Sequence, residues 1–418
     1  MQLQRRKVVK AIAGVALGAQ MQMAISQAAN PIKVGMGMAL TGALASGGRA
    51  ALVAIQMWIA DVNRQGGLLG RPVQLIHYDD QSSPASVPGL YAKLIDIDKV
   101  DLLVSGYGTN LQVTAMPLVM ERKLLFMGML GTGVNDKFRY DRFFQAFPAG
   151  PDARLAMSEV FFEAAMTMNP RPKTVALIGA DAEFSSLAMD GARENLRKHG
   201  LAIVFERTYP PNTGEFGSLL RALGASKPDI VYVASYPPDS VGIIRAAREI
   251  GLKAQMFGGA MVGTQFAAIK AQLGPALNGV VSHELYVPEP SMKFPGIEDF
   301  LKRYQVEAAK GKLDSLGFYI PPFVYAHMQI LEQAVKAVGS LDQGRLADHI
   351  RRTSFKTVVG DVAFGPLGEW QQSRVLFVQF RNIAGTDVEQ FRQPGKHIVL
   401  GPGVFRSGEL RYPYVPAA

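Results

Sequence analysis

The chain has 418 residues, enough for two or three domains. Hydrophobic residues make up 48% of it and aromatic residues 9%, a composition that supports packed cores and excludes a disordered chain. The formal net charge is +9, and subtracting the four basic residues in 5–10 leaves +5 for residues 29–418. The remaining basic residues form no dense stripe with interleaved aromatic residues, so we expect no nucleic-acid partner.

Residues 1–28 have the features of an export signal. Basic residues at Arg5, Arg6, Lys7 and Lys10 precede a short, weakly apolar run, and Ser26-Gln27-Ala28 resembles a cleavage site. The run is too short to span a bilayer. The arginine pair is typical of a twin-arginine signal, although the Sec route stays open. We therefore predict a cleaved N-terminal signal and a periplasmic protein.

The stretch from Ile32 to Asp80 predicts a strand, a helix and a second strand. Apolar residues alternate from Ile32 to Met38, as expected for a strand. From Ala50 to Val62 they crowd one helical face, and Gly66-Gly67 supplies a helix stop. The order predicts a βαβ unit.

The same alternation continues for some 250 residues and predicts parallel sheets covered by helices. Two series of alternating strands and helices follow a similar order, and the second series begins at Thr174. The expected strands are 72–78, 101–105, 124–127 and 229–234, and the expected helices are 111–122, 152–166, 216–223 and 240–250.

Several patterns that could carry other chemistry are weak. Gly35-x-Gly37 followed by Gly42 lacks the dinucleotide-binding spacing and predicts a tight strand-to-helix turn. Asp79 and Asp80 are adjacent on a strand and point to opposite faces, so turn hydrogen bonds are the expected use. Six scattered histidines show no metal-binding spacing, and no nucleophile elbow or phosphate loop is present. We expect no catalytic residues, no metal and no cofactor.

The chain also has no cysteine. That excludes a disulfide framework, thiol catalysis, thiolate metal sites and a lipid anchor on an N-terminal cysteine.

Two glycine-rich loops are the candidate binding site. SGYGTN (105–110) and GMLGTG (128–133) each follow a predicted buried strand. Such loops lie at the carboxyl ends of parallel strands, where open α/β sheets bind ligands. Exposed backbone N–H groups and a threonine hydroxyl suit a carboxylate, while ordinary turns are the alternative.

The amino-acid sequence of residues 32–80 closely resembles the N-terminal part of leucine/isoleucine/valine-binding proteins, the solute receptors of one class of ABC importer. The resemblance extends to about Gly368. It implies a type I periplasmic binding protein: α/β, with two doubly wound parallel-sheet lobes joined by three crossings. We place the crossings near 147–150, 282–287 and 358–362. Lobe one would comprise 30–148 and 288–358, and lobe two 149–287 and 359–418 with the C-terminal tail.

The resemblance also assigns ligand contacts. A Ser or Thr and then a Thr that bind the ligand carboxylate match Thr109 and Thr132. A backbone carbonyl that contacts the ligand amine matches Leu130. Two tyrosines of the second lobe match Phe184 and Tyr236, so one of them has lost its hydroxyl here.

Other matched positions depart from the family pattern. The acid that pairs with the ligand ammonium matches Ala260. The tyrosine that covers the pocket matches Gly47, which leaves space where a covering ring would stand. A disulfide near the ligand falls on Ser82 and Gly108, so both of its cysteines are missing. Because a buried ammonium without a counter-charge costs several kcal/mol, the departures favour an aromatic or longer aliphatic acid over leucine. An acid from a neighbouring loop position remains an alternative.

We therefore predict a periplasmic receptor, a monomer, that captures a small carboxylate and delivers it to an inner-membrane ABC permease without catalysing a reaction. The rival prediction is a ligand sensor on the same fold that signals to a membrane kinase or chemoreceptor.

Overall fold

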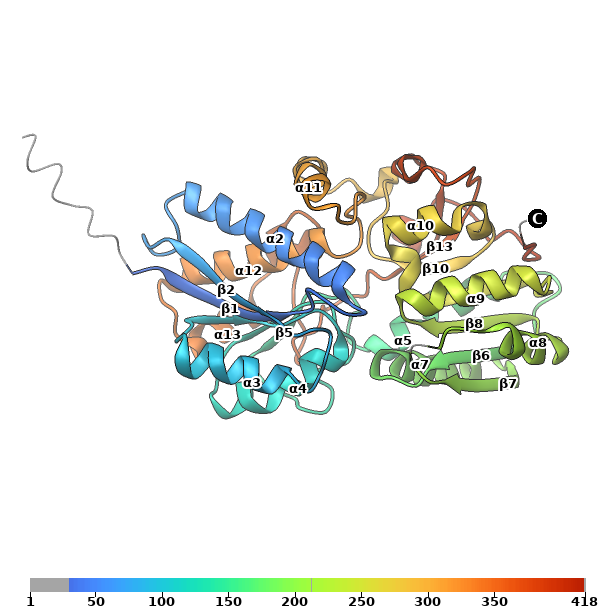
Figure 1. Cartoon of the computed structure of the whole chain (residues 1–418), viewed down its shortest axis with the longest axis horizontal. Helices are drawn as coiled ribbons and strands as arrows, with labels where there is room; N and C mark the ends of the chain where they lie inside the picture. Colours follow the sequence, from blue (N-terminus) through green and yellow to red (C-terminus); the bar gives the residue numbers. More distant parts are fainter. Residues whose placement is uncertain (1–29, 212, 417–418) are drawn as a thin grey trace, which may run out of the picture.

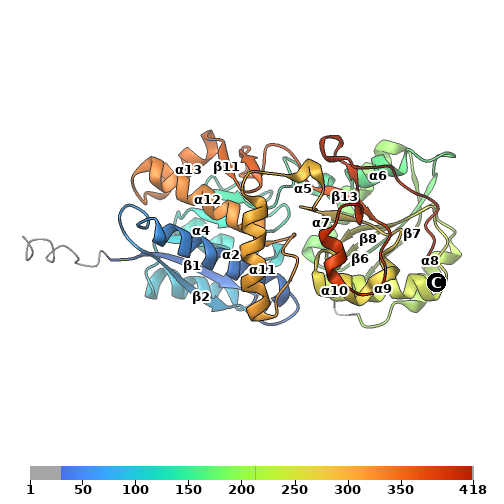
Figure 2. The ribbon, with the colours of Figure 1, turned by 90° about the horizontal axis from the view of Figure 1, so that it is seen from above.

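The computed structural model describes residues 30–211 and 213–416. It has two α/β halves side by side, as Figure 1 shows, and Figure 2 presents the same arrangement from above. The predicted export signal over 1–28 lies outside the described residues. In the described part, no helix is long and apolar enough to cross a membrane.

The first half is built on a five-stranded sheet with the order β2-β1-β3-β4-β5. Every neighbouring pair in this sheet is parallel. Helices cover both faces of the sheet, with α2 and α12 on one side and α3 and α4 on the other (Figure 1). The strands are β1 (Ile32–Met38), β2 (Val73–Asp79), β3 (Leu102–Val104), β4 (Phe126–Gly128) and β5 (Phe143–Gln145). The helices are α2 (Ala45–Arg64), α3 (Val87–Ala92), α4 (Thr109–Glu121), α11 (Ile297–Gly311), α12 (Pro321–Val338) and α13 (Gln343–Arg352).

The second half is built on a seven-stranded sheet with the order β14-β13-β10-β9-β8-β6-β7. Its strands from β7 to β10 pair in parallel, whereas β13 and β14 join in antiparallel fashion. The strands are β6 (Thr174–Ala180), β7 (Ala202–Tyr209), β8 (Ile230–Ser235), β9 (Met256–Met261), β10 (Val281–Glu284), β13 (Leu376–Phe380) and β14 (His397–Gly401). The helices are α5 (Ala153–Ala156), α6 (Glu159–Ala165), α7 (Glu183–His199), α8 (Gly217–Ala225), α9 (Pro237–Glu249) and α10 (Ala267–Leu273). The predicted α/β class with two doubly wound halves is therefore confirmed, and the antiparallel strands add to it.

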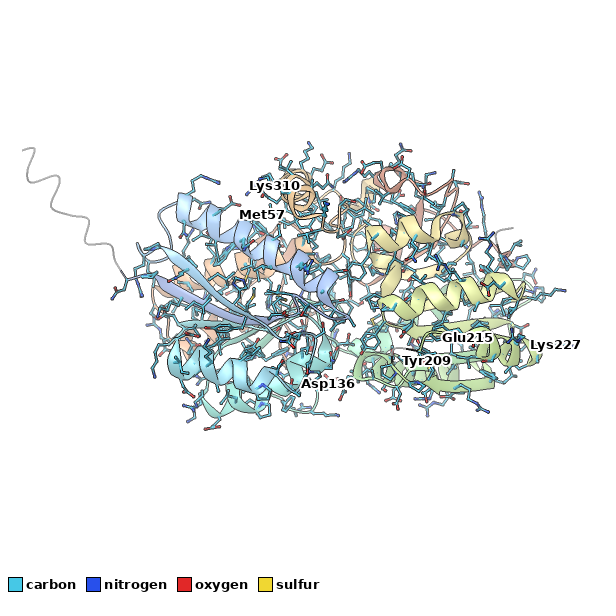
Figure 3. The ribbon with its side chains drawn as sticks, viewed as in Figure 1. Met57, Asp136, Tyr209, Glu215, Lys227 and Lys310 are labelled. Atoms are coloured by element: carbon cyan, nitrogen blue, oxygen red, sulfur yellow. The ribbon has the colours of Figure 1, made fainter. Side chains whose placement is uncertain are left out.

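Helix α2 shows how the sequence pattern becomes packing. Its small and apolar residues recur every three or four positions and are buried, including Ala51, Ile55, Trp58 and Val62. Figure 3 shows Met57 on α2 and Lys310 on α11, the helices that pack on each other along the outside of the first half. The indole N–H of Trp58 donates to a carboxylate of α12, which fixes α2 against that helix.

The chain passes from the first sheet to the second between β5 and α5, and it returns between β10 and α11. A hairpin, β11 (Phe355–Thr357) and β12 (Gly360–Val362), follows α13. Residues beyond this hairpin still contact the first half, since the Gln145 N–H donates to the Gly368 carbonyl at 2.8 Å. The last passage to the second sheet therefore lies between 370 and β13, later than the predicted 358–362. The lobe boundaries drawn from the resemblance stay predictions.

Candidate functional site

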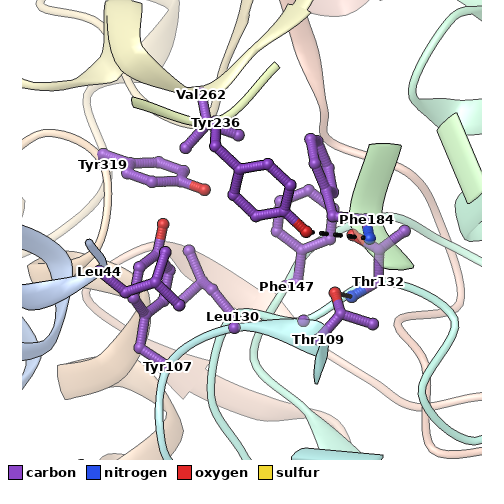
Figure 4. Close-up of a pocket in the computed structure, with 12 residues that line it drawn as sticks. Leu44, Tyr107, Thr109, Leu130, Thr132, Phe147, Phe184, Tyr236, Val262 and Tyr319 are labelled. Carbon is purple, nitrogen blue, oxygen red and sulfur yellow. Dashed lines mark hydrogen bonds between the residues drawn. The ribbon is translucent and has the colours of Figure 1, made fainter. Parts of the chain in front are cut away.

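A small cavity lies where the two halves meet. It has about 400 Å³ of unfilled space, part of it open to solvent. A larger groove, with about 1160 Å³ of unfilled space, lies between α2 and α11 and is lined by the first half alone. The cavity is lined by Leu44, Tyr107, Gly108, Thr109, Leu130, Gly131, Thr132, Phe147, Phe184, Tyr236, Val262 and Tyr319 (Figure 4).

The floor of the cavity comes from the loops that follow β3 and β4. Gly108 has φ of 113°, a conformation that favours glycine, and it turns the chain into α4. The first N–H groups of a helix have no partner within the helix, so the start of α4 presents donors near Thr109. The Thr109 Oγ1 accepts the Thr132 N–H at 3.0 Å, which joins the two loops.

Buried polar side chains behind the floor hold these loops in place. The Ser105 hydroxyl accepts the Met129 N–H at 2.7 Å, and the Gln112 side-chain amide donates to the Met129 carbonyl at 2.7 Å. Gln145 donates to Gln112 at 3.1 Å. Ser105 lies in the predicted loop 105–110. Gln112 and Gln145 could not be identified from the sequence, because a polar residue inside a helix or strand gives no signal of the loop it will support.

The second half provides an aromatic wall. Phe184 lies in the first turn of α7 and Tyr236 directly precedes α9. Their rings meet edge to face with centroids 5.9 Å apart, and the Phe184 N–H donates to the Tyr236 hydroxyl at 3.3 Å (Figure 4). Burial raises the pKa of Tyr236 to about 12, so its hydroxyl is neutral at physiological pH.

The structure thus brings together five of the seven residues that the resemblance assigns to the ligand: Thr109, Leu130, Thr132, Phe184 and Tyr236. The Leu130 carbonyl, assigned to a ligand amine, accepts the Gly108 N–H at 3.2 Å.

The other two assigned residues are not among those that line the cavity. Ala260 is buried inside β9, and Val262, two residues further on, lines the cavity instead. The open space expected beside Gly47 is filled: a Cβ there would lie 2.7 Å from Ile320 Cδ1 and would also collide with the ring of Tyr107.

Tyr107 and Tyr319 are site residues that the sequence analysis did not identify. Tyr107 lies in the glycine-rich loop 105–110, and Tyr319 precedes α12. Both are buried, and their rings are nearly perpendicular with centroids 6.4 Å apart. Burial, followed by the neighbouring Tyr319, raises the pKa of Tyr107, so this hydroxyl also stays protonated.

His283 is packed behind the cavity, with its ring centroid 6.5 Å from that of Phe184 and 6.4 Å from that of Tyr319. Burial lowers the pKa of His283 to about 3, so the ring is neutral and offers no counter-charge. Its neighbour Glu284 points elsewhere, to the buried Lys270 at 2.8 Å.

The remaining carboxylates singled out in the sequence also support the fold. Asp79 accepts N–H bonds from Leu40, Thr41 and Gln81, which closes the turn after β1. Asp80 accepts the Ser82 N–H at 2.9 Å. Within the described residues, no group of three or more His, Cys, Asp or Glu side chains could hold a metal ion.

Comparison with known proteins shows the family. The family model described as periplasmic binding protein matches residues 31–382. The "Leu/Ile/Val-binding protein homolog 2" of Brucella abortus (strain 2308) is 24% identical over 354 residues, covering 84% of this chain and 90% of that protein. The chain therefore belongs to the periplasmic binding protein family and is a type I member similar to Leu/Ile/Val-binding proteins. Proteins of this family are exported receptors that bind small ligands and work with ABC-transporter permeases.

Solved structures show the same fold with different ligands. A solute-binding protein of an R. palustris ABC transporter in complex with benzoate has a TM-score of 0.74 and 18% identity, covering 91% of this chain and 98% of that one. A branched-chain amino acid transporter substrate-binding protein from Streptococcus pneumoniae, in complex with isoleucine, has a TM-score of 0.72 and 17% identity, covering 92% of this chain and 100% of that one. The fold is therefore compatible with both an aromatic acid and an amino acid.

Proposed function

We propose that this chain is the receptor of an ABC importer for a small carboxylate that lacks a charged amine. The two halves close on this acid and present it to the membrane permease. An aromatic acid is the favoured ligand. The proposal rests on the contents of the cavity between the halves rather than on the fold, which also accommodates amino acids.

The observation that carries the proposal is the absence of charge around the cavity. Among the twelve described residues that line it, none is Asp, Glu, Lys or Arg. A ligand ammonium enclosed there would be a buried unpaired charge, which costs several kcal/mol. The cavity suits a carboxylate better than an ammonium, because hydroxyl and backbone N–H groups can bind a carboxylate without a cation.

The donors lie together at one end of the cavity. Because the Thr109 oxygen already accepts the Thr132 N–H, its own O–H is free to donate to a ligand oxygen. Thr132, which also lines the cavity, and the N–H groups at the start of α4 lie beside it. Two or three such charge-assisted bonds are enough to bind and orient one carboxylate.

The lining of the cavity favours an aromatic ligand. Phe147, Phe184 and Tyr236 contribute aromatic rings to it. A ring packed against these side chains gains apolar burial and edge-to-face contacts without needing a counter-charge. The structural relative that is bound to benzoate supports this choice.

Calorimetric titration of unfolded and refolded protein tests the proposal, since refolding removes any ligand carried through purification. We expect benzoate to bind in the micromolar range or tighter and leucine to bind at least about a hundredfold more weakly, a difference of about 2.7 kcal/mol. Micromolar binding of leucine, isoleucine or valine, with weak binding of benzoate, would overturn the proposal and favour an amino-acid receptor.

A further inference from the structure

Two tyrosine hydroxyls lie at the end of the cavity away from the threonines. In Figure 4 the hydroxyls of Tyr107 and Tyr319 face each other on one side, while Thr109 and Thr132 lie on the other. Leu130 lies between the two groups. The cavity therefore has polar groups at both ends and an apolar middle.

The two tyrosines are held rigidly. The Tyr319 ring meets the Phe266 ring edge to face, with centroids 5.7 Å apart. The Tyr107 ring packs on α2 at Gly47, where no larger residue would fit. Both tyrosine residues are about 4% exposed, so neither can turn its hydroxyl to bulk solvent without moving its neighbours. The hydroxyls are thus fixed before a ligand arrives.

The chemistry of this end is that of a hydrogen-bonding clamp. Each phenol has one donor and can accept further bonds, so even a pair bonded to each other leaves one donor and several acceptor positions. A purely apolar ligand end would leave that remaining buried donor without a partner, which is costly. A ligand hydroxyl placed between the two phenols can both donate and accept.

From this arrangement we propose that the ligand is an aromatic acid with a hydroxyl group opposite its carboxylate. The carboxylate is bound at Thr109 and the start of α4, and the hydroxyl is bound by Tyr107 and Tyr319. This inference rests on the proposed receptor function and narrows its ligand class, because the tyrosine pair selects against acids with an apolar far end.

Titration of the refolded protein with benzoate and with 4-hydroxybenzoate tests the inference. We expect the wild type to bind 4-hydroxybenzoate about tenfold more tightly, the range of one or two net hydrogen bonds. In Tyr107→Phe and Tyr319→Phe the ratio of the two affinities should fall to within about twofold. Tyr414→Phe is the matched control, since Tyr414 is buried beside Ala254, ahead of β9 and at the other end of that strand from Val262. It should keep the wild-type ratio.

The outcomes separate the two proposals. Equal affinities for both acids in the wild type would overturn the tyrosine clamp and leave the acid receptor standing. A wild-type preference that persists in both phenylalanine variants would show that other residues read the hydroxyl, and it would also overturn the inference. Failure of the wild type to bind either acid would overturn the receptor proposal together with it.

Discussion

Thr109 illustrates how one hydroxyl can join two loops by accepting a hydrogen bond and still have an O–H to donate. Its oxygen accepts the Thr132 N–H across the two loops, and its position at the first residue of α4 places it beside the free N–H groups of the helix. A hydroxyl in this setting is oriented by the bond that it accepts. The same residue therefore joins the two loops and, in the proposed complex, donates to the ligand.

Replacement of Thr109 or Thr132 by alanine should weaken acid binding by about 1.5–3 kcal/mol each, because each variant loses a bond to a charged oxygen. Thr114→Ala, on the same helix but bonded only to the helix carbonyls of Asn110 and Leu111, is the matched control and should bind normally. Titration calorimetry measures the effect. Unchanged affinity in both site variants would remove the threonines from the ligand contacts.

At the scale of single residues, the sequence could indicate loops better than side-chain directions. It identified the loop that holds Thr109 but not the role of Tyr107, two residues earlier, because the turn of the backbone at Gly108 decides where each side chain points. It also expected open space at Gly47, and the Tyr107 ring fills that space. A single sequence does not show which neighbour will occupy the volume left by a missing side chain.

At the scale of elements, the loop between α11 and α12 of the first half forms hydrogen bonds to the second half. The Asp314 carboxylate accepts the Ala267 N–H of α10 at 3.1 Å, and the Ser315 carbonyl accepts a bond from Arg392 at 2.8 Å. The same loop carries Tyr319 into the cavity. Because the loop bonds to the second half and belongs to the first, its bonds hold the two halves together beside the cavity. If the halves close on a ligand as proposed, these bonds favour the closed arrangement.

Asp314→Ala should therefore lower acid affinity by roughly 1 kcal/mol, about fivefold, although Asp314 is not among the residues that line the cavity. The ligand must then provide the free energy of closure that this bond contributed. Asp299→Ala, an exposed acid on α11, is the control and should not change the affinity. Small-angle scattering should show a larger radius of gyration for ligand-free Asp314→Ala; identical affinity and radius in the variant and wild type would contradict this role.

Elements themselves were predicted well where their periodicity is strong. The strand and helix of β1 and α2 follow from alternating and helical apolar patterns, and the structure extends the helix to Ala45. The single helix expected over 152–166 is instead two, α5 and α6, separated at Met157–Ser158. There Asn195 of α7 donates to Ser158 and to the Leu155 carbonyl, a contact between distant segments that local patterns do not contain.

At the scale of the molecule, two sheets bring loops from both halves to one shared cavity (Figure 1). Two features of the sequence predicted this architecture: the order of strands and helices, which repeats in both halves, and the family resemblance. They could not give the chemistry of the cavity, which depends on side chains from segments as distant as Leu44 and Tyr319. The cavity rather than the fold distinguishes an acid receptor from an amino-acid receptor.

A crystal structure of the refolded protein with 4-hydroxybenzoate tests the central claim most directly. We predict the carboxylate within about 3 Å of the Thr109 hydroxyl and an N–H at the start of α4, with no charged side chain in contact. The ring should lie against Phe184 and Tyr236. A carboxylate bound instead by an Arg or Lys side chain, or located away from Thr109, would contradict the account.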